Sequence, residues 1–360
     1  MRHPDPVVQE VIDVWLPRFL DGGIALGDLT ATIGRVASWD DWPGEWMVTA
    51  TIHEELAQAA EEEGRELVAT GEWLTAARCH HLGYFVATRD VDLHERGLRR
   101  MLACHDRALP GLEPVVERFE VAEHGDVPRV VGLLSVPRGV NRPPVVILLP
   151  GLDSTKETRH SGRGGWLRRG MAVVSMDGPG QGEASLWSRI RPDYEVALAA
   201  VIDWIESRSD LDGGRIAVAG SSLGGYYAAR VASFEPRVRA TVVNCGPYDW
   251  GECIEKVPQV TKEAFTHYSG AADWEEARRL AGRLTLHGVA ERIVSPLMVV
   301  HGRADPLIPW QQAQRLADAA SGETRFQLVD EGSHSVSNLP YRWAPVAQDW
   351  VASHLGASAI

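Results

Sequence analysis

A chain of 360 residues, 44% of them hydrophobic, can bury a substantial core and is long enough for one large domain and a smaller one. Its net charge of −13 and pI near 5.5 exclude the basic face that binding to nucleic acid or to an anionic membrane requires. Four scattered cysteines without a C-x-x-C pair, no basic and apolar leader, and no apolar run of about 18 residues predict a cytoplasmic protein that spans no membrane.

Apolar residues recur at helical spacing through residues 6–110, where alanine and glutamate are also abundant. Helix breakers at residues 40–44, at Glu63-Gly64 and at Gly71 predict a division into four or five helices. Pro110-Gly111 ends the pattern. Residues 1–115 are therefore expected to form an all-helical domain.

The pattern changes to short β-rich runs from residue 116 onward. Residues 115–121 and 129–136 flank His124-Gly125-Asp126, which predicts a hairpin. Further apolar runs at residues 145–149, 172–176, 216–219, 240–243, 297–300 and 325–329 alternate with helical patterns such as 194–208, 224–233 and 311–320. This alternation predicts an α/β domain over residues 116–360, with a mostly parallel, doubly wound sheet and the hairpin at an antiparallel edge. The long connection at residues 249–292, with helical patterns at 261–268 and 274–282, is expected to form part of a lid.

Ser222 is the candidate nucleophile, in the sequence Gly220-Ser-Ser-Leu-Gly224. A G-x-S-x-G match is weak alone, but this one follows an apolar run and precedes a helix-forming stretch. That order of strand, sharp turn and helix presents a serine hydroxyl above the end of a sheet, and the glycines let the turn tighten.

A serine hydroxyl needs a base to accept its proton and a third group to orient that base. Asp305 follows the run at 297–300, and His334 follows the run at 325–329, in the expected order of serine, acid and histidine. Each lies beyond the carboxyl end of its strand, where open parallel sheets place their ligands. His301 is the competing histidine, but it precedes the acid on the same strand end and is interpreted as structural.

A tetrahedral intermediate also needs amide donors for its oxyanion. The Leu223 amide, just after the nucleophile, is the first candidate, and the second is the Leu152 amide or that of Asp153, in the loop after residues 145–149. The stretch at residues 177–182 lacks the G-x-G-x-x-G spacing and is interpreted as a turn of the domain core, not as a nucleotide site. No zinc-ligand or Walker spacing occurs, so neither a metal nor a cofactor is expected.

These motifs resemble a branch of the α/β-hydrolase superfamily that has an N-terminal helical cap, and that includes 2,6-dihydroxypseudooxynicotine hydrolase and the fungal polyketide-shortening hydrolases. The resemblance rests on residues 150–157, 177–182 and 301–305, the turn around Ser222, Gly332-Ser-His334, and residues 71–84 of the helical part. Only the loop at 150–157 and the helical part are specific to the branch.

The resemblance implies hydrolysis of a carbon–carbon bond next to a ketone, on an aryl ketone or β-diketone. It also implies a substrate pocket between the cap and the catalytic domain, and we expect a homodimer. The candidate pocket residues are Asp153, Trp39, Trp42, Trp46, His80, His81 and Tyr84, although aromatic residues of amphipathic helices belong to the core more often than to a pocket. An acidic lid residue assists some relatives, and Glu252 and Glu255 are the candidates for it here, but neither is assigned to the catalytic set.

Three alternatives remain open at this point. A carboxylesterase or thioesterase would use the same acyl-enzyme chemistry. An exopeptidase of the prolyl-oligopeptidase kind shares similar motifs, but it would need a β-propeller where this chain is helical. A hydrolase fold can also serve as a ligand receptor, against which the complete set of catalytic motifs argues.

Overall fold

The computed structural model describes all 360 residues and contains two compact units. One unit comprises residues 1–116 and 258–264, and the other comprises residues 117–257 and 265–360.

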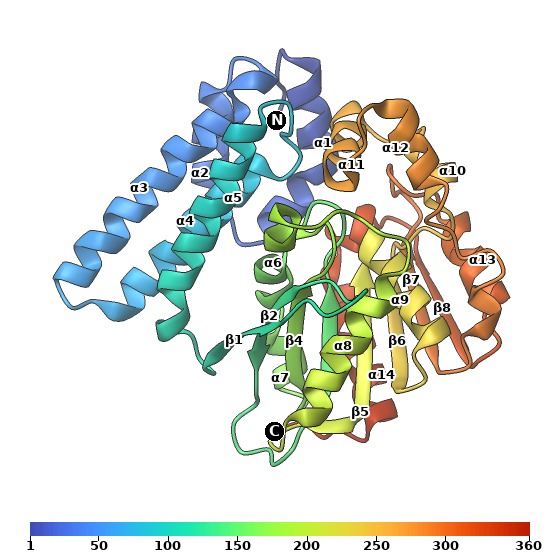
Figure 1. The fold of residues 1–360 in the computed structure, drawn as a ribbon. Helices are drawn as coiled ribbons and strands as arrows, with labels where there is room; N and C mark the ends of the chain where they lie inside the picture. The colour runs from blue at the N-terminus through green and yellow to red at the C-terminus, as the bar shows by residue number, and fades with distance from the viewer. The chain divides into compact units, whose positions relative to one another are not determined.

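The first unit is helical, as its periodicity predicts. It contains α1 (Pro6–Asp21), α2 (Leu26–Arg35), α3 (Trp42–Glu62), α4 (Glu66–Tyr84) and α5 (Val91–Ala108), drawn in blue to cyan in Figure 1. The expected break at Glu63-Gly64 is confirmed, and Gly64 has a φ of +71° that favours glycine. The expected break at Gly71 is wrong, since α4 runs through it. A single glycine costs a helix only about 1 kcal/mol, which the packing of its neighbours offsets.

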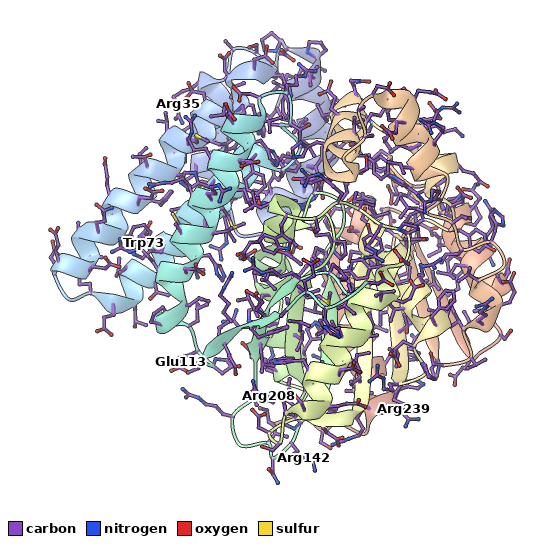
Figure 2. The ribbon with its side chains drawn as sticks, viewed as in Figure 1. Arg35, Trp73, Glu113, Arg142, Arg208 and Arg239 are labelled. Carbon is purple, nitrogen blue, oxygen red and sulfur yellow. The ribbon has the colours of Figure 1, made fainter.

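Tryptophans form much of the core of this unit. Trp42 and Trp46 are fully buried on α3, and the Trp42 indole N–H donates to the Leu82 carbonyl at 2.8 Å. Trp73 of α4, labelled in Figure 2, donates to Glu61 of α3 at 2.7 Å, and the Arg107 guanidinium of α5 covers its ring at 4.3 Å. Polar partners therefore satisfy the indole N–H groups of Trp42 and Trp73 while their rings pack the helices together.

The second unit is built on one sheet of eight strands in the order β1-β2-β4-β3-β5-β6-β7-β8. The strands are β1 (Val116–Val121), β2 (Val130–Ser135), β3 (Pro144–Leu149), β4 (Ala172–Asp177), β5 (Asp212–Ser221), β6 (Val238–Asn244), β7 (Leu297–Gly302) and β8 (Thr324–Val329). All pairs from β4 to β8 are parallel, and β2 pairs antiparallel with β4. The expected mixed sheet with its antiparallel edge is therefore confirmed.

Helices cover both faces of this sheet (Figure 1). On one face, α7 (Gly164–Leu167) and the C-terminal α14 (Ala344–Leu355) pack on alternate residues of β3 to β7, with Trp166 and Trp350 in the cluster. On the other, α8 (Tyr194–Ser207) and α9 (Leu223–Phe234) pack on β5. The strands are buried on both sides, which explains their continuous apolar runs.

The remaining helices are α6 (Lys156–His160), α10 (Trp250–Ile254), α11 (Gln259–Ser269), α12 (Trp274–Ala281) and α13 (Gln311–Ala319). The helical patterns expected at residues 261–268 and 274–282 correspond to α11 and α12. The four cysteines are buried and form no disulfide. No helix has both the length and the apolar composition that crossing a bilayer requires.

Candidate active site

Ser222 lies in the sharp turn between β5 and α9, half-buried, with φ of 57° and ψ of −132°. This positive φ is uncommon for a residue with a side chain and is typical of a nucleophile elbow. The turn closes only because its neighbours are glycines. A Cβ at Gly220 would lie 1.9 Å from the Gly224 carbonyl oxygen, and one at Gly224 would lie 2.5 Å from the Pro150 carbonyl oxygen.

The backbone holds this turn from both sides. The Ser222 N–H donates to the Asn244 carbonyl of β6 at 2.9 Å, and the Gly225 N–H donates to the Ser222 carbonyl at 2.8 Å. Leu223 is the first residue of α9, so its amide has no partner within the helix. The amide therefore stands beside the serine as a free donor at the positive end of a helix dipole.

The loop after β3 approaches Ser222 closely. A Cβ at Gly151 would lie 3.1 Å from the Ser222 Cβ and 3.6 Å from its Oγ. The Gly151 amide already donates to the Ser154 hydroxyl at 2.7 Å. Of the amides in this loop, those of Leu152 and Asp153 thus remain candidates for the second oxyanion donor, and Leu152 is buried.

Gln181 supports this loop, a role that the sequence did not reveal. It is almost fully buried, and its side-chain amide donates to the Pro150 carbonyl at 2.6 Å. Its side-chain carbonyl accepts from the Gly178 amide at 3.1 Å and from the Tyr194 hydroxyl at 2.7 Å. The turn at residues 177–182, expected to be part of the domain core, thus holds the loop after β3 in place.

A buried ionic cluster ties the same two loops together further on. The Lys156 ammonium, fully buried, contacts Glu157 at 2.6 Å, Glu183 at 2.7 Å and Asp177 at 3.2 Å. Asp177 also accepts the backbone N–H groups of Lys156 at 2.7 Å and of Glu183 at 2.9 Å. Burial alone would lower the pKa of Lys156, but the three carboxylates outweigh it and raise that pKa. Burial raises the pKa of Asp177 to about 6, with Lys156 opposing the shift.

Asp305 and His334 come together although they follow different strands, β7 and β8. The His334 Nδ1 lies 2.7 Å from the Asp305 Oδ2, and the Asp305 Oδ1 accepts the amides of Leu307 at 2.8 Å and Ile308 at 3.0 Å. The Asp305 side chain is fully buried. Burial by itself raises the pKa of this carboxyl, but contacts with His334 and His301 outweigh it and hold the pKa well below its usual range.

His301 lies on the other side of the same carboxylate. Its Nε2 is 2.9 Å from the Ile308 carbonyl and 3.4 Å from the Asp305 Oδ2, and the residue is fully buried.

His334 begins a short 3₁₀ segment (His334–Val336) and retains a small exposure. The structure joins Asp305 to His334 directly, whereas no hydrogen bond joins the Ser222 hydroxyl to His334; such bonds are often long until substrate is bound.

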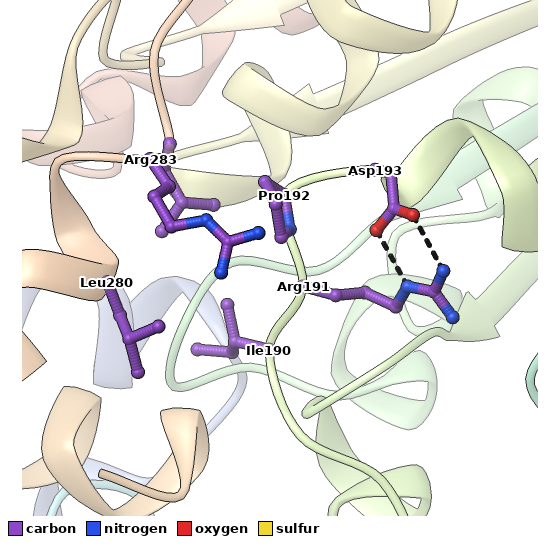
Figure 3. Close-up of a pocket in the computed structure, with 7 residues that line it drawn as sticks. Ile190, Arg191, Pro192, Asp193, Leu280 and Arg283 are labelled. Carbon is purple, nitrogen blue, oxygen red and sulfur yellow. Dashed lines mark hydrogen bonds and ion pairs between the residues drawn. The ribbon is translucent and has the colours of Figure 1, made fainter.

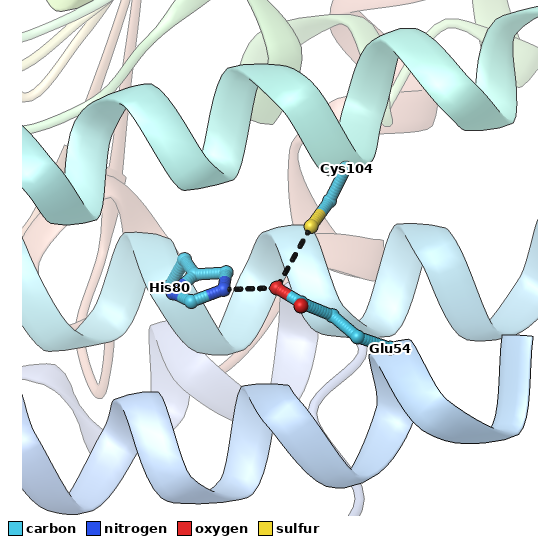
Figure 4. A group of neighbouring side chains, drawn as sticks. All are labelled: Glu54, His80 and Cys104. Carbon is cyan, nitrogen blue, oxygen red and sulfur yellow. Dashed lines mark hydrogen bonds and ion pairs between the residues drawn. The ribbon is translucent and has the colours of Figure 1, made fainter. Parts of the chain in front are cut away.

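The helical-unit candidates occupy buried positions. His80 donates its Nε2 to Glu54 at 2.6 Å, and the Cys104 thiol reaches the same carboxylate oxygen at 3.3 Å (Figure 4). These donor types can bind a metal ion, but the Arg100 guanidinium also contacts Glu54 and compensates its charge. His81 Nδ1 lies 3.2 Å from the Tyr84 hydroxyl. Trp39 packs on Trp42 with ring centroids 5.4 Å apart.

The two acidic candidates in the segment expected to form part of a lid lie at the surface. Glu252 of α10 is exposed, accepts from the Gln312 side chain at 3.0 Å and pairs with Arg315. Glu255 is exposed beside Arg278, at 3.8 Å. Both carboxylates are therefore engaged by neighbouring surface groups.

One cavity of about 300 Å³ lies between the segment before α8 and the end of α12 (Figure 3). An Arg191–Asp193 ion pair, with N–O distances of 2.7 and 2.6 Å, forms one side. The lining residues are Ile190, Arg191, Pro192, Asp193, Leu280, Arg283 and Leu284, and they include none of the expected site residues.

Comparisons with known proteins agree with the fold and with the motifs. The model of the family described as "Esterase FrsA-like" matches residues 29–355. The 2,6-dihydropseudooxynicotine hydrolase of Paenarthrobacter nicotinovorans is 31% identical over 338 residues, which cover 93% of this chain and 90% of that protein. The 20-hydroxy-prefusarin hydrolase FUS2 of Gibberella moniliformis is 31% identical over 242 residues, 63% of this chain and 57% of that protein.

The crystal structure of the 2,6-dihydroxy-pseudo-oxynicotine hydrolase is also similar, with a TM-score of 0.85 at 29% identity, covering 94% of this chain and 95% of that chain. The resemblance inferred from the motifs is therefore confirmed at the level of the family. This chain belongs to the FrsA-like esterase family and is an α/β hydrolase.

Proposed function

We propose that this hydrolase works through an acyl-enzyme on Ser222, with His334 as general base and Asp305 as the residue that orients and stabilises the histidine. The observation that carries the proposal is the 2.7 Å contact between His334 Nδ1 and a buried Asp305 carboxylate. This contact selects the tautomer in which Nδ1 carries the proton, and so leaves Nε2 to accept the serine proton.

We further propose that the bond cleaved is a carbon–carbon bond next to a ketone. Ser222 Oγ attacks the ketone carbon while His334 takes the serine proton, and the carbonyl oxygen becomes an oxyanion that accepts from the Leu223 amide and the Leu152 or Asp153 amide. The carbon–carbon bond then breaks, its electron pair leaves as an enolate or phenolate, and the His334 imidazolium protonates the leaving group. Water, deprotonated by His334, hydrolyses the ester on Ser222 and releases the acid.

Two similarities support this choice of bond. The branch-specific loop at residues 150–157 resembles that of the carbon–carbon hydrolases, and the 31% identity to 2,6-dihydropseudooxynicotine hydrolase extends over nearly the whole chain. Asp153, in that loop, is proposed to face the substrate.

The second candidate is a carboxylesterase, favoured by the match to a family described as esterases. The two functions differ in the leaving group, because an enolate is a poorer leaving group than an activated phenolate.

The test is to assay purified enzyme on p-nitrophenyl esters and on aryl 1,3-diketones, with the products identified by mass. We expect turnover of diketones to an acid and a ketone; turnover of esters alone would make the enzyme an esterase.

A further inference from the structure

Asn244 makes a hydrogen bond with each of two loops that carry the proposed catalytic residues. It is the last residue of β6 and is almost fully buried. Its backbone carbonyl accepts the Ser222 N–H at 2.9 Å. Its side-chain Nδ2 donates to the carbonyl of Ser335, the residue after His334, at 2.8 Å. Asn244 therefore contacts Ser222 through its backbone and the histidine loop, residues 333–338, through its side chain.

The histidine loop needs such support because its backbone is strained. Ser335 and Val336 have φ values of 57° and 49°, so two consecutive residues with side chains are in the left-handed region, and one of them is β-branched. Within the loop, the Asn338 side chain accepts the Ser333 amide at 2.8 Å. The Asn244 side chain donates to the backbone of the same loop, at the Ser335 carbonyl.

The side-chain oxygen of Asn244 shows why an asparagine is needed at this position. Its Oδ1 is buried and has no hydrogen-bond partner. A buried polar atom without a partner is unfavourable, so a smaller or apolar residue would serve packing better. Keeping asparagine here is explained by what its donor half does at the Ser335 carbonyl.

The neighbouring residue belongs to the same arrangement. Cys245 has a φ of 49°, and its amide donates to the Val300 carbonyl of β7 at 2.8 Å. Its buried thiol lies with the Asp305 carboxylate and a His334 ring nitrogen in a group whose polar atoms are all within 4.8 Å of one another. The titratable groups around this end of β6 are thus His334, Asp305, Cys245 and His301.

We propose that Asn244 is a positioning residue that holds His334 in register with Ser222 through the Ser335 carbonyl. The inference rests on the proposed function of Ser222 and His334, and it deepens that function, since Asn244 itself touches no substrate. A displacement of about 1 Å of a catalytic group can cost about 10²-fold in rate.

The test uses Asn244→Asp, which preserves size but donates a hydrogen bond only when the introduced carboxyl group is protonated. The probe is a fluorophosphonate, whose second-order labelling rate reports activation of the serine without knowledge of the substrate. At pH 8 we expect labelling to be slowed by about 10- to 100-fold relative to the unmodified enzyme. The ratio of the two rates should return toward one as the pH falls to about 5.5, because burial favours the protonated carboxyl group.

Thr241→Val is the matched control, because Thr241 lies on the same strand, is fully buried and has an unpartnered hydroxyl. It should label at the unmodified rate.

Asn244→Ala should be labelled slowly at every pH. If the alanine variant does not fold, the isosteric Asn244→Asp variant still tests the inference. A rate ratio for Asn244→Asp that stays constant with pH, or equal slowing by Thr241→Val, would overturn the inference alone. Labelling that peptide mapping places on a serine other than Ser222 would overturn the proposed function as well.

Discussion

Ser222 is held by backbone hydrogen bonds on both sides, so its hydroxyl contributes little to the fold. Its N–H and carbonyl are bonded to Asn244 and Gly225, and these bonds survive the loss of the hydroxyl. The fold and the proposed chemistry therefore depend on different atoms of Ser222.

Ser222→Ala should therefore fold normally and lose turnover by several orders of magnitude, since loss of the nucleophile removes the covalent route. The measurements are kcat on the substrate found in the panel and the melting temperature. Labelling by a fluorophosphonate should disappear at the same time. A variant with near-normal turnover and labelling would show that another serine is the nucleophile.

Asp305→Asn should reduce kcat by about 10⁴-fold, the effect known for the corresponding change in serine proteases, because the amide favours the wrong tautomer of His334. Asp330→Asn is the matched control, since Asp330 lies near His334 in the chain but pairs with Arg303 at the surface. The control should keep its activity. If instead Asp330→Asn or Asp249→Asn were the damaging change, Asp305 would not be the acid.

The lowered pKa of Asp305 also predicts how the stability of the fold depends on pH. Its folded-state pKa lies below the ordinary value of 3.8, so the unfolded chain binds a proton more readily than the folded one. The stabilisation is therefore present above about pH 4 and is lost as the pH falls through the folded-state pKa. The melting temperature of Asp305→Asn should fall short of the unmodified enzyme's at pH 7, and the gap should narrow below pH 4. A gap that does not change with pH would contradict this account.

At the scale of elements, two loops are held together by groups that the motifs did not explain. Gln181 bonds the loop after β3 to the turn after β4, and Lys156 neutralises carboxylates from both. The geometry of the proposed oxyanion donors thus depends on side chains that have no part in the proposed chemistry.

Lys156→Met should be strongly destabilising, by about 3–5 kcal/mol, because it leaves buried carboxylates without their cation. The carboxylates of the variant should have raised pKa values in the folded state, so protonation restores stability. Its deficit in melting temperature should accordingly shrink between pH 7 and pH 5. Lys256→Met is the control, since Lys256 is exposed. A deficit that is small at pH 7 would mean that the cluster contributes little.

At the scale of the whole molecule, the helical residues 1–115 carry no catalytic motif, and we propose that they take part in choosing the substrate. A cap over an active site, in general, excludes water and bulky competitors. A chain that begins at residue 116 should hydrolyse p-nitrophenyl acetate, which tests the triad, but should lose its preference between small and bulky acyl groups. Unchanged kinetics and preference in the shortened chain would reject this role.

The sequence by itself determined the class of fold and the positions of the candidate catalytic residues. Strands buried on both faces leave continuous apolar runs. Glycine is required at positions 220 and 224 because a Cβ there would lie 1.9 or 2.5 Å from a backbone oxygen. Both signals are therefore local. Gly71 misled the prediction, because an exposed glycine marks a break only where packing does not carry the helix onward.

Only the tertiary structure decided which distant groups meet. Asp305 contacts His334 because β7 and β8 are adjacent and parallel, and Asn244 reaches Ser335 because β6 ends beside them. Gln181 bonds to Pro150, which lies 31 residues earlier in the chain, and Lys156 pairs with Asp177, 21 residues later. No spacing in the sequence encodes such contacts. Periodicity and turn residues record local backbone preferences, whereas hydrogen bonds between loops depend on the order of strands in the sheet.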